Sequence, residues 1–449
     1  MAISCLDTRY LADVSPLISV CDEFAYYRNR IYIEIEYFKR ITGLDIKYNP
    51  LNPVEFTQKD FQNILSQESV LRHDVKAIEY FIKDIPEISN SGKAHLVHIG
   101  LTSQDICSPA FIMCFDQSVN IILEQLNQFI TIFKTQLIPE TTDTQQPIYM
   151  LGLTHGQPAT PTAFQKEMLI YSQRLENIYK EINTLIIGSL TVKFGGATGE
   201  FNAMCFTCPE VEWVKWCDEF IQNVSKGRYR RSELTNQCDD YDSVCIVLYV
   251  VKRMLHILEH LRGNIWLYIN RGYLTQRVIP NEIGSSTMPN KVNPIDLENA
   301  KTAIEMGKRM IDGICDILNE TSFQRDVSDS SAVRNIASVF GYVLVALKKM
   351  TTGIGRLQPN WENIKKDLVN HPEVILEGIQ TYLKYHCGIA DSYEIMKAAS
   401  RGRDNITLAD IHSVIDGLGL NDSINVNDEH KTRLKSLTPE TYIGTFSRK

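Results

Sequence analysis

The sequence predicts an all-α protein built around a long central helix bundle. Apolar residues recur at spacings of three and four over several long stretches, which is typical of helices that bury one stripe. The stretch 244–267 is apolar on nearly all sides, so other helices of a bundle or of an oligomer must surround it. Strand-like alternation with Asn-Gly or Asp-Gly turns is scarce.

Four further stretches carry the helical pattern. The first has its apolar residues at helical spacing from Phe115 to Leu137, after which Pro139 is expected to end the helix. The other expected helices cover 168–185, 294–318 and a segment that includes 339–347.

A chain of 449 residues is too long for one ordinary core, so two or three domains are expected. Apolar residues make up 44% and charged residues 22% of the chain, which is the composition of a soluble globular protein. Several polar or proline-containing segments interrupt the helical pattern. Among them, 353–359 is the preferred boundary before a small C-terminal helical domain.

Charge and cysteine usage argue against several classes of function. The net charge of −8 argues against a general nucleic-acid-binding surface, so a few local cations must hold any anionic ligand. The eleven cysteines lack paired spacing and the N-terminus lacks a leader pattern, which favours the reducing cytoplasm. Lys252 and Arg253 interrupt the most apolar stretch, so no membrane-spanning role is expected.

Residues 284–294, GSSTMPNKVNP, form an unusual polar interval between apolar segments. Asn293 followed by Pro294 is typical of a helix N-cap and first helical residue, and acidic residues follow in the first turn. The unpaired N–H groups of that helix end attract an anion, and Lys291 adds a full charge beside them. Gly284 can adopt backbone angles that other residues avoid. The sequence therefore predicts an anion-binding loop.

The same arrangement recurs in THGQPATP, residues 154–161. Thr160 and Pro161 are interpreted as the cap and first residue of the helix that carries the stripe from Met168. His155 then lies in the loop that approaches this helix.

The segment LTSQD, residues 101–105, is interpreted in the same way. Thr102 or Ser103 can cap a helix, and Asp105 can complete a capping box. Three loops rich in hydroxyl, imidazole or amide groups thus each precede a long helix. If the helices form a bundle, these loops can meet at its ends, within one chain or across subunits.

Each of these loops also has a purely structural interpretation. A pair of serines before a helix, here Ser285 and Ser286, is more often cap chemistry than a catalytic base. A lone loop histidine such as His155 is more often a surface residue, and Asn293 needs to do no more than cap its helix. A lysine, an asparagine and two serines in one glycine-started loop exceed what a structural turn requires, which favours a functional interpretation.

No metal and no cofactor are expected from the sequence. Cys205 and Cys208 have metal-like spacing, but no second pair or HxxxH partner follows at a usable distance. His95 and His98 have no evident third ligand. The glycine-rich stretch 193–201 lacks the Lys-Ser/Thr end of a phosphate loop.

The loop and its continuation resemble a family signature. GSSTMPNKVNPIDLEN, residues 284–299, is similar to the signature loop of the fumarase/aspartase superfamily, whose members release fumarate from a succinyl-containing substrate. Within that superfamily, adenylosuccinate lyases resemble this chain at RHDVKAIEYF (72–81), THGQPATP (154–161) and QRDVSDSSAVRN (324–335). The similarity runs over nearly the whole chain, from Asp7 to Phe446.

The resemblance implies an architecture of three helical domains in a homotetramer. The central bundles of four subunits then pack together, and each active site takes loops from three subunits. The expected divisions are an N-terminal helical domain, a central bundle with the signature loop, and a C-terminal helical domain, over residues 1–103, 104–356 and 357–449.

The resemblance also implies a β-elimination in purine nucleotide biosynthesis. Fumarate would leave adenylosuccinate to give AMP, and leave succinyl-aminoimidazole-carboxamide ribotide to give the carboxamide ribotide. Ser285 is then the base that removes a proton, and His155 is the acid that protonates the departing amino nitrogen. Lys291 stabilises negative charge, Glu298 orients the histidine, and His73 completes the expected catalytic set.

A small-molecule purine nucleotide is the expected substrate, and its binding residues follow from matching family positions. The expected set is Arg9, Tyr10, Arg72, Asp74, Thr102, Ser103, Gln157, Asn293, Arg325, Ser330 and Arg334. Arginines suit phosphate and carboxylate groups because they make paired hydrogen bonds. The chain departs from the family at 234–241, where a substrate-binding glutamine is usual and the candidates are Thr235, Asn236 and Gln237.

Two alternatives stay open at this point. A sister lyase that acts on argininosuccinate, malate or aspartate would not need the nucleotide-binding set Arg72, Arg325, Ser330 and Arg334. A non-catalytic helical protein that kept the fold as a scaffold would not need the catalytic set Ser285, His155, Lys291 and Glu298.

Overall fold

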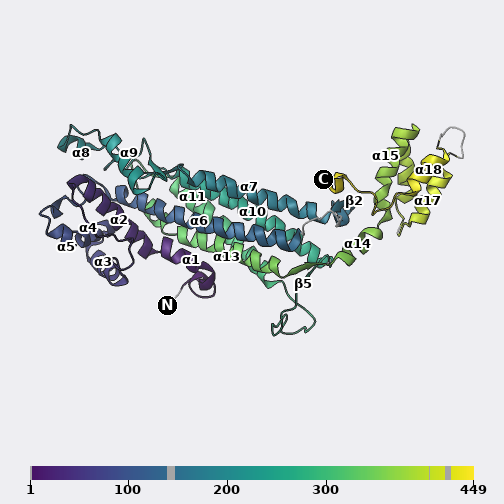
Figure 1. The fold of residues 1–449 in the computed structure, drawn as a ribbon, viewed down its shortest axis with the longest axis horizontal. Coiled ribbons are helices and arrows are strands. Elements are labelled where there is room, and N and C mark those ends of the chain that lie inside the picture. The colour runs from purple at the N-terminus through teal and green to yellow at the C-terminus, as the bar shows by residue number, and fades with distance from the viewer. Residues whose placement is uncertain (1–2, 139–146, 404, 420–425, 449) are drawn as a thin grey trace. The chain divides into compact units, whose positions relative to one another are not determined.

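The computed structural model describes residues 3–138, 147–403, 405–419 and 426–448 (Figure 1). The chain folds mainly into helices, which confirms the predicted all-α class. Five helices correspond to the five helical stretches expected from the sequence: α6 (Ser103–Leu137), α7 (Phe164–Ile186), α10 (Asp242–Asn270), α11 (Ile295–Leu318) and α13 (Ile336–Gly355).

The other helices and the strands complete the described fold. The remaining α-helices are α1 (Leu11–Cys21), α2 (Glu23–Thr42), α3 (Gln58–Leu71), α4 (Asp74–Lys83), α5 (Pro86–Ser89), α8 (Asn202–Thr207), α9 (Trp213–Val224), α12 (Ser328–Val333), α14 (Trp361–Val369), α15 (Leu376–Cys387), α16 (Ser392–Ser400), α17 (Leu408–Gly417) and α18 (Asp428–Lys435). Short strands pair as β1 (Tyr149–Thr154) with β2 (Gln157–Ala163), β3 (Leu190–Val192) with β4 (Tyr229–Arg231), and β5 (Leu274–Gln276) with β6 (Leu357–Pro359).

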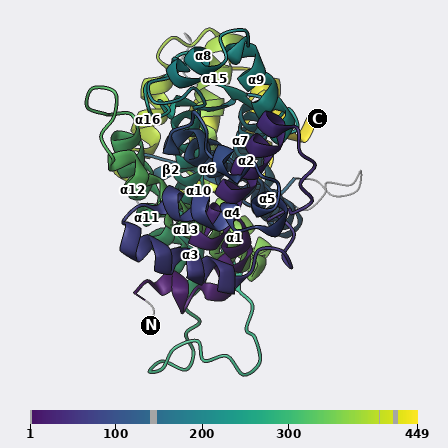
Figure 2. The same cartoon turned by 90° about the vertical axis from the view of Figure 1, so that its left-hand side faces the viewer.

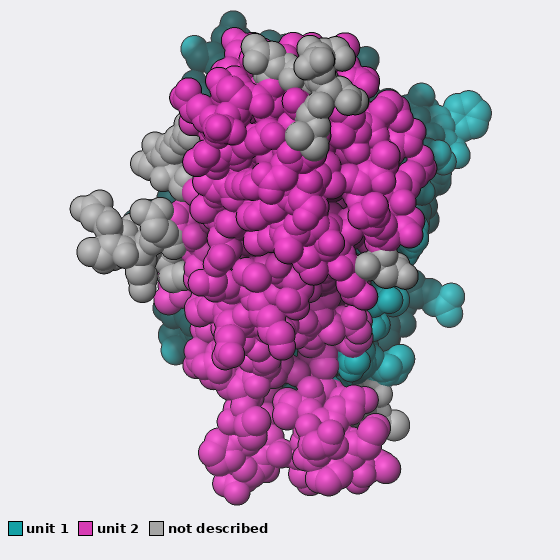
Figure 3. All heavy atoms as spheres, turned by 90° about the vertical axis from the view of Figure 1, so that its right-hand side faces the viewer, with its two compact units in different colours: residues 1–130, 174–260, 295–353 teal, residues 131–173, 261–294, 354–449 magenta. Residues whose placement is uncertain are grey.

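The chain forms two compact units, which Figure 3 shows in different colours. Unit 1 comprises Met1–Ile130, Arg174–His260 and Ile295–Gly353. Unit 2 comprises Thr131–Gln173, Leu261–Pro294 and Ile354–Lys449. The three-domain division at 103/104 and 356/357 stays a prediction.

Long helices run side by side as a bundle in unit 1 (Figures 1 and 2). Phe115 of α6 packs against Phe340 of α13, with ring centroids 5.5 Å apart. A Cβ added to Gly307 of α11 would lie only 3.1 Å from a methyl carbon of Leu255 in α10. The apolar stripes predicted from the sequence therefore form the core that these helices share.

A second group of buried apolar residues lies under the N-terminal helices of unit 1. Ile31 and Phe38 of α2 are fully buried there together with Phe56, and Ile78 and Ile82 of α4 join them. This packing fixes the junction at which α3 ends and α4 begins. Several predicted binding residues lie at that junction.

Unit 2 has its own core among the C-terminal helices. Ile379 and Leu383 of α15 are fully buried in it, and so is Ile415 of α17. Leu151 of β1 also belongs to this cluster. The hairpin made by β1 and β2 is therefore anchored on the C-terminal helices of the same unit.

The hairpin corrects one sequence prediction. Thr160 and Pro161 do not cap a helix, because both lie in β2 and α7 begins only at Phe164. The strands pair from Thr154 with Gln157, so His155 and Gly156 form a two-residue turn. Both turn residues have positive φ, of 54° and 73°, as a tight hairpin turn requires. Prolines fit here because a two-stranded ribbon leaves one side of each strand unpaired.

Two other helix ends are close to their predicted positions. The helix after the serine loop begins at Ile295, so Pro294 precedes the first helical residue rather than being that residue. At the start of α6, the Thr102 N–H donates to Asp105 Oδ2 over 2.8 Å, which is the predicted carboxylate half of a capping box. The α6 helix ends at Leu137, and Pro139 lies outside the described residues.

Among the residues that the structure describes, two helical segments are long and apolar enough, by length and composition, to cross a membrane. They are Ser103–Leu137 and Ser328–Gly355, whose most apolar windows are 78% and 61% buried inside the protein. Core helices of a globular protein meet the same criterion. The segments are thus explained by the bundle that contains them.

Helix α10, predicted to be surrounded, is only partly covered within one chain. Its residues Val247, Leu248 and Met254 are buried, but Ile246 is 51% exposed and Tyr249 is 45% exposed. The apolar character on that side is therefore not explained by packing inside one chain.

An ion pair in unit 1 predicts a pH-dependent stability. The His98 Nδ1 atom lies 2.9 Å from Glu34 Oε2, and the Glu34 side chain is fully buried. Burial by itself would lower the pKa of His98, but the charge and hydrogen bond of Glu34 outweigh it and raise that pKa. A raised pKa means that the pair stabilises the fold fully below the unfolded pKa and loses this contribution as pH rises through the folded pKa.

We therefore expect His98→Gln to destabilise the protein more at pH 6 than at pH 9, by about 1 to 3 kcal/mol at the lower pH. Urea unfolding at the two pH values measures the difference. His95→Gln, an exposed neighbour, is the matched control and should show no such dependence. An equal effect of His98→Gln at both pH values would contradict the charged pair.

Candidate active site

A cavity of about 420 Å³ opens in unit 1, and many predicted site residues line it. This volume is in the usual range for small-molecule sites. The predicted residues that line it are Arg72, His73, Asp74, Ser103, Arg325, Ser330 and Arg334. Because three guanidinium groups surround one space, the cavity suits an anionic ligand.

The Arg72–His73–Asp74 segment is held in a sharp junction between two helices. Arg72 ends α3 in a left-handed conformation with φ 54°, which is unusual for a residue other than glycine. His73 then caps α4, and its Nδ1 atom accepts a hydrogen bond from the Lys76 N–H over 3.1 Å. With Nδ1 used as an acceptor, a neutral His73 carries its proton on Nε2.

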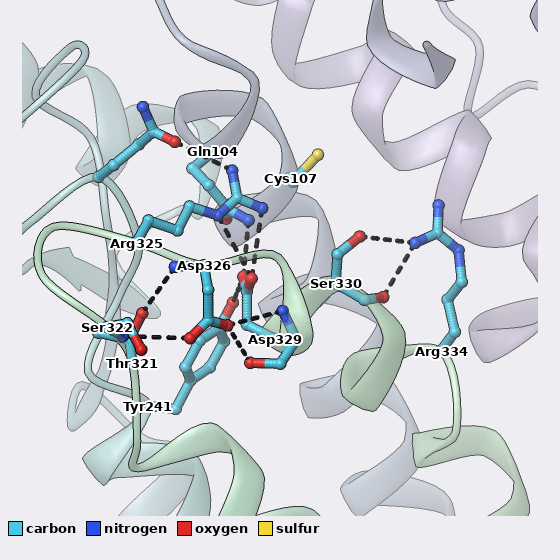
Figure 4. A network of polar contacts seen from close by, with 12 residues as sticks. Gln104, Cys107, Tyr241, Thr321, Ser322, Arg325, Asp326, Asp329, Ser330 and Arg334 are labelled. Atoms are coloured by element: carbon cyan, nitrogen blue, oxygen red, sulfur yellow. Dashed lines mark hydrogen bonds and ion pairs between the residues drawn. The ribbon is translucent and has the colours of Figure 1, made fainter. Parts of the chain in front are cut away.

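Arg325 is held by a buried carboxylate that the sequence interpretation missed (Figure 4). Asp329 accepts hydrogen bonds from Gln104 Nε2 over 2.8 Å and from the Tyr241 hydroxyl over 3.0 Å. Arg325 donates to the same carboxylate from Nε and Nη2, each over 3.3 Å. The sequence offers little signal for this pair, because Arg325 precedes α12 and only Asp329 lies in its first turn.

The 234–241 segment also reaches this network. The Arg325 Nη1 atom donates to Gln237 Oε1 over 3.3 Å, and the Gln237 N–H donates to the Gln324 carbonyl over 3.2 Å. Thr235, by contrast, lies against Gly199. Of the three candidates for the family's glutamine, Gln237 is thus the one in contact with a residue that lines the cavity.

Arg334 lies at the end of α12 and makes contacts on three sides. It donates from Nη1 to Ser330 Oγ over 2.8 Å, and Figure 4 shows the two side chains facing each other. It donates from Nη2 to Asp74 Oδ2 over 2.9 Å and from Nε to Glu23 Oε1 over 3.0 Å. With 31% of its side chain exposed, it can still reach a ligand.

A buried ion pair supports the segment that carries Thr102 and Ser103. Lys193 Nζ lies 2.7 Å from Asp105 Oδ1, and both side chains are fully buried. The Gly195 N–H donates to the same oxygen over 2.6 Å, so the glycine-rich stretch wraps around the start of α6. Burial lowers the pKa of Lys193, and Asp105 opposes this effect.

We expect Lys193→Met to cost about 3 to 5 kcal/mol of stability, because it leaves the Asp105 charge buried without its counter-ion. Urea unfolding of the variant measures the loss. Lys47→Met is the matched control, since Lys47 and Asp45 form a pair whose side chains are each 76% exposed, and its midpoint should not change. A Lys193→Met protein as stable as the native one would refute the role of the pair.

Four predicted residues of unit 1 do not line the cavity: Thr102, which directly precedes the lining residue Ser103, and Arg9, Tyr10 and Glu298. Arg9 and Tyr10 precede α1 and do not line the cavity, and Lys349 Nζ lies 6.0 Å from the centre of the Tyr10 ring. Glu298 is exposed in the first turn of α11. Unit 1 therefore brings most of its predicted binding residues to one cavity, whereas these four residues lie outside the cavity lining.

The serine loop lies in unit 2 with Lys291 and Asn293. Ser285 Oγ accepts hydrogen bonds from the Met288 N–H over 3.1 Å and from the Thr287 N–H over 3.4 Å. A Cβ on Gly284 would lie 2.4 Å from the Lys291 carbonyl oxygen. The glycine is thus required by the close approach of the two loop ends, and not by the unusual backbone angles expected from the sequence.

His155 and Gln157 lie in unit 2 on the β1–β2 hairpin. His155 is exposed at the tip of the hairpin, and Gln157 opens β2 directly after the turn. The turn therefore leaves the His155 imidazole exposed on the surface of unit 2.

Comparison with known proteins identifies the family of the chain. A family model described as "Lyase" matches residues 45–307, and one described as "Adenylosuccinate lyase C-terminal" matches residues 321–443. The adenylosuccinate lyase of Dictyostelium discoideum is 36% identical over 99% of this chain and 96% of its own length. That of Escherichia coli strain K12 is 31% identical with the same coverage of both chains.

Solved structures share the fold at low identity. A fumarate lyase from Mesorhizobium sp. BNC1 superposes with a TM-score of 0.74 at 14% identity, over 97% of this chain and 96% of that one. The β-carboxy-cis,cis-muconate cycloisomerase of Acinetobacter calcoaceticus gives 0.69 at 16% identity, over 97% and 95%. The helical fold and the serine loop thus define a lyase of the fumarase/aspartase superfamily. Within it, the full-length relatives place the chain in one group: it belongs to the adenylosuccinate lyase family.

Proposed function

We infer that this chain is an enzyme that eliminates fumarate from adenylosuccinate to give AMP. It also releases fumarate from succinyl-aminoimidazole-carboxamide ribotide to give the carboxamide ribotide, in purine nucleotide biosynthesis. The observation that carries this function is the match to adenylosuccinate lyases over nearly the full length of the chain. The arginine-lined cavity of unit 1 supports a phosphorylated substrate.

The chemistry requires a base, a stabilised carbanion and an acid. A proton leaves the carbon next to a carboxylate, the electron pair spreads into that carboxylate, and the C–N bond then breaks. We assign the base to Ser285, whose oxygen already accepts two backbone N–H groups that would also stabilise its ionised form. Lys291 and the N-terminus of α11 are assigned to the developing negative charge.

The remaining catalytic roles follow the family pattern. His155 is assigned as the acid that protonates the departing nitrogen, and Glu298 as the carboxylate that orients it. His73 is assigned to the catalytic set, with Nε2 as the atom left to face a ligand. Gln157 and Asn293 are assigned to substrate binding on the basis of their positions beside the acid and the loop lysine.

The nucleotide half is assigned to the cavity of unit 1. Arg72, Arg325 and Arg334 supply positive charge there, with Ser103 and Ser330 as hydroxyl donors. The family's missing glutamine is assigned to Gln237, because it contacts Arg325. Arg9, Tyr10 and Thr102 keep their assigned binding role from the family pattern.

We also propose that the enzyme is a homotetramer. Apolar side chains are exposed along the long helices of unit 1, including Ile246 and Tyr249 of α10 and Met306 and Ile317 of α11. Exposed apolar groups of this kind favour burial against other subunits. Light scattering coupled to gel filtration tests the assembly, and a monomer at micromolar concentration would contradict it.

The proposed compartment is the cytoplasm. All of the cysteines are free thiols in the structure, as expected for a protein of a reducing compartment.

One assay tests the function directly. Purified protein is mixed with adenylosuccinate, and the ultraviolet absorbance change of the elimination is followed, with the succinyl-carboxamide ribotide in parallel. Argininosuccinate, malate and aspartate are assayed alongside to test a sister lyase. Turnover of neither purine substrate would refute the proposal, and turnover of none of the five would favour a non-catalytic scaffold.

A further inference from the structure

A chain of charged groups lies behind the wall of the unit 1 cavity. It begins at Arg30 of α2, whose side chain is completely buried. Its guanidinium lies between the rings of Tyr26 and Tyr27, 4.3 Å and 4.0 Å from their centres. Arg30 Nη1 donates to Asp74 Oδ2 over 2.7 Å, and Arg334 Nη2 donates to the same oxygen over 2.9 Å.

The contacts of Asp74 leave little of its carboxylate for a ligand. Oδ2 already accepts from two guanidinium groups, and Oδ1 accepts from the Val75 N–H over 2.8 Å. Burial would raise the pKa of Asp74, but the charge and hydrogen bond of Arg30 overcome this and lower it to about 2. Asp74 is therefore an anion at neutral pH, and protein donors occupy most of its acceptor positions.

Arg30 is difficult to explain as a purely structural residue. Two of its nitrogens, Nε and Nη2, are buried without a hydrogen-bond partner among the described residues. A buried charge that is incompletely bonded costs stability, and an apolar side chain of similar size often serves a core better. What Arg30 does provide is a fixed position for Asp74, in the wall of the cavity.

We propose that Arg30 is a positioning residue, which fixes Asp74 so that Asp74 holds Arg334 in place at the cavity for the anionic group of the substrate. Asp74 then also acts by positioning, and not as a substrate contact. The proposal rests on the proposed function of this cavity, and it adds a residue outside the expected site. Arg30 itself touches no reacting atom.

We call the series Arg30–Asp74–Arg334 the relay. It predicts that a change at Arg30 weakens substrate binding and leaves the rate of the chemical step nearly unchanged. Arg30→Lys keeps the charge and loses the planar fork, so we expect KM for adenylosuccinate to rise about ten- to a hundredfold, the scale of one charge-assisted hydrogen bond. The dissociation constant of AMP, measured by calorimetry, should rise by the same factor. The value of kcat should stay within about threefold, since the reacting groups are untouched.

A double-mutant cycle separates positioning from general loosening of the fold. Arg334→Gln alone should raise KM at least as much as Arg30→Lys. Adding Arg30→Lys to Arg334→Gln should then produce little further change, because the relay has lost its end point. Arg28→Lys, on the same helix and bonded to the Ser19 carbonyl, is the matched control with unchanged KM.

Several results would overturn the relay. It fails if Arg30→Lys binds AMP like the native enzyme, or if the effects of the two substitutions simply multiply. If Arg30→Lys does not fold, Asp74→Asn, which keeps the side-chain size, takes its place in the same cycle with the same criteria. Turnover by the native enzyme tests the proposed function separately, because the relay concerns only the ratios between variants.

Discussion

Replacing Ser285 with alanine is expected to lower kcat by about two to four orders of magnitude, the scale for an acid-base residue, without unfolding the protein. The physical reason is the environment of Oγ, which accepts the N–H groups of Thr287 and Met288. Donors to an oxygen favour its ionised form, which is the form that removes a proton. Steady-state kinetics measures the loss, and circular dichroism checks the fold.

Ser286→Ala is the matched control, because Ser286 is the adjacent exposed serine of the same loop. Its kcat should stay close to the native value. Near-normal activity of Ser285→Ala would mean that this serine only caps the loop and that another group is the base. Loss of activity in Ser286→Ala alone would mean that Ser286, and not Ser285, is the base.

Replacing His155 with alanine is expected to lower kcat by about two to four orders of magnitude as well. The departing amino nitrogen must gain a proton as the C–N bond breaks, because it would otherwise leave as a very basic anion. The ring lies at the exposed tip of a hairpin whose turn backbone does not depend on the imidazole, so the variant should fold normally. Steady-state kinetics measures kcat, and the thermal unfolding midpoint shows whether the variant is as stable as the native protein.

Chemical rescue makes this second test specific. Added imidazole should restore part of the activity of His155→Ala, since a free imidazole can deliver the missing proton. It should not restore Ser285→Ala or increase the activity of His95→Ala, an exposed histidine outside the assigned site. Native kcat in His155→Ala would place the acid elsewhere.

The helices were predictable from the sequence because their signal is local. Spacings of three and four between apolar residues located α7, α10 and α11 to within a few residues, and they fell inside α6 and α13, which extend beyond the predicted stretches at one or both ends. The hairpin at β1–β2 was not recognised, because His155 and Gly156 replace the usual Asn-Gly turn and prolines imitate a helix start. A His-Gly pair is not a usual hairpin-turn sequence, so nothing in the sequence indicated a hairpin at this position.

The candidate site was predictable where it matched a linear motif. Arg72, Arg325 and Arg334 lie in the family-like stretches 72–81 and 324–335, and the structure brings them to one cavity. Asp329 and Arg30 were missed because their roles depend on contacts with residues far along the chain, which spacing does not reveal.

The close approach of Gly284 to the Lys291 carbonyl has a mechanical consequence. The segment between them is a nearly closed ring, because its two ends lie in contact. The Gln276 side-chain amide also donates a hydrogen bond to the Val292 carbonyl over 2.9 Å, beside the same end of the segment. A ring of this kind carries Ser285 and Lys291 together. If the segment shifts against its surroundings, Ser285 and Lys291, the assigned base and charge-stabilising cation, move together and keep their spacing.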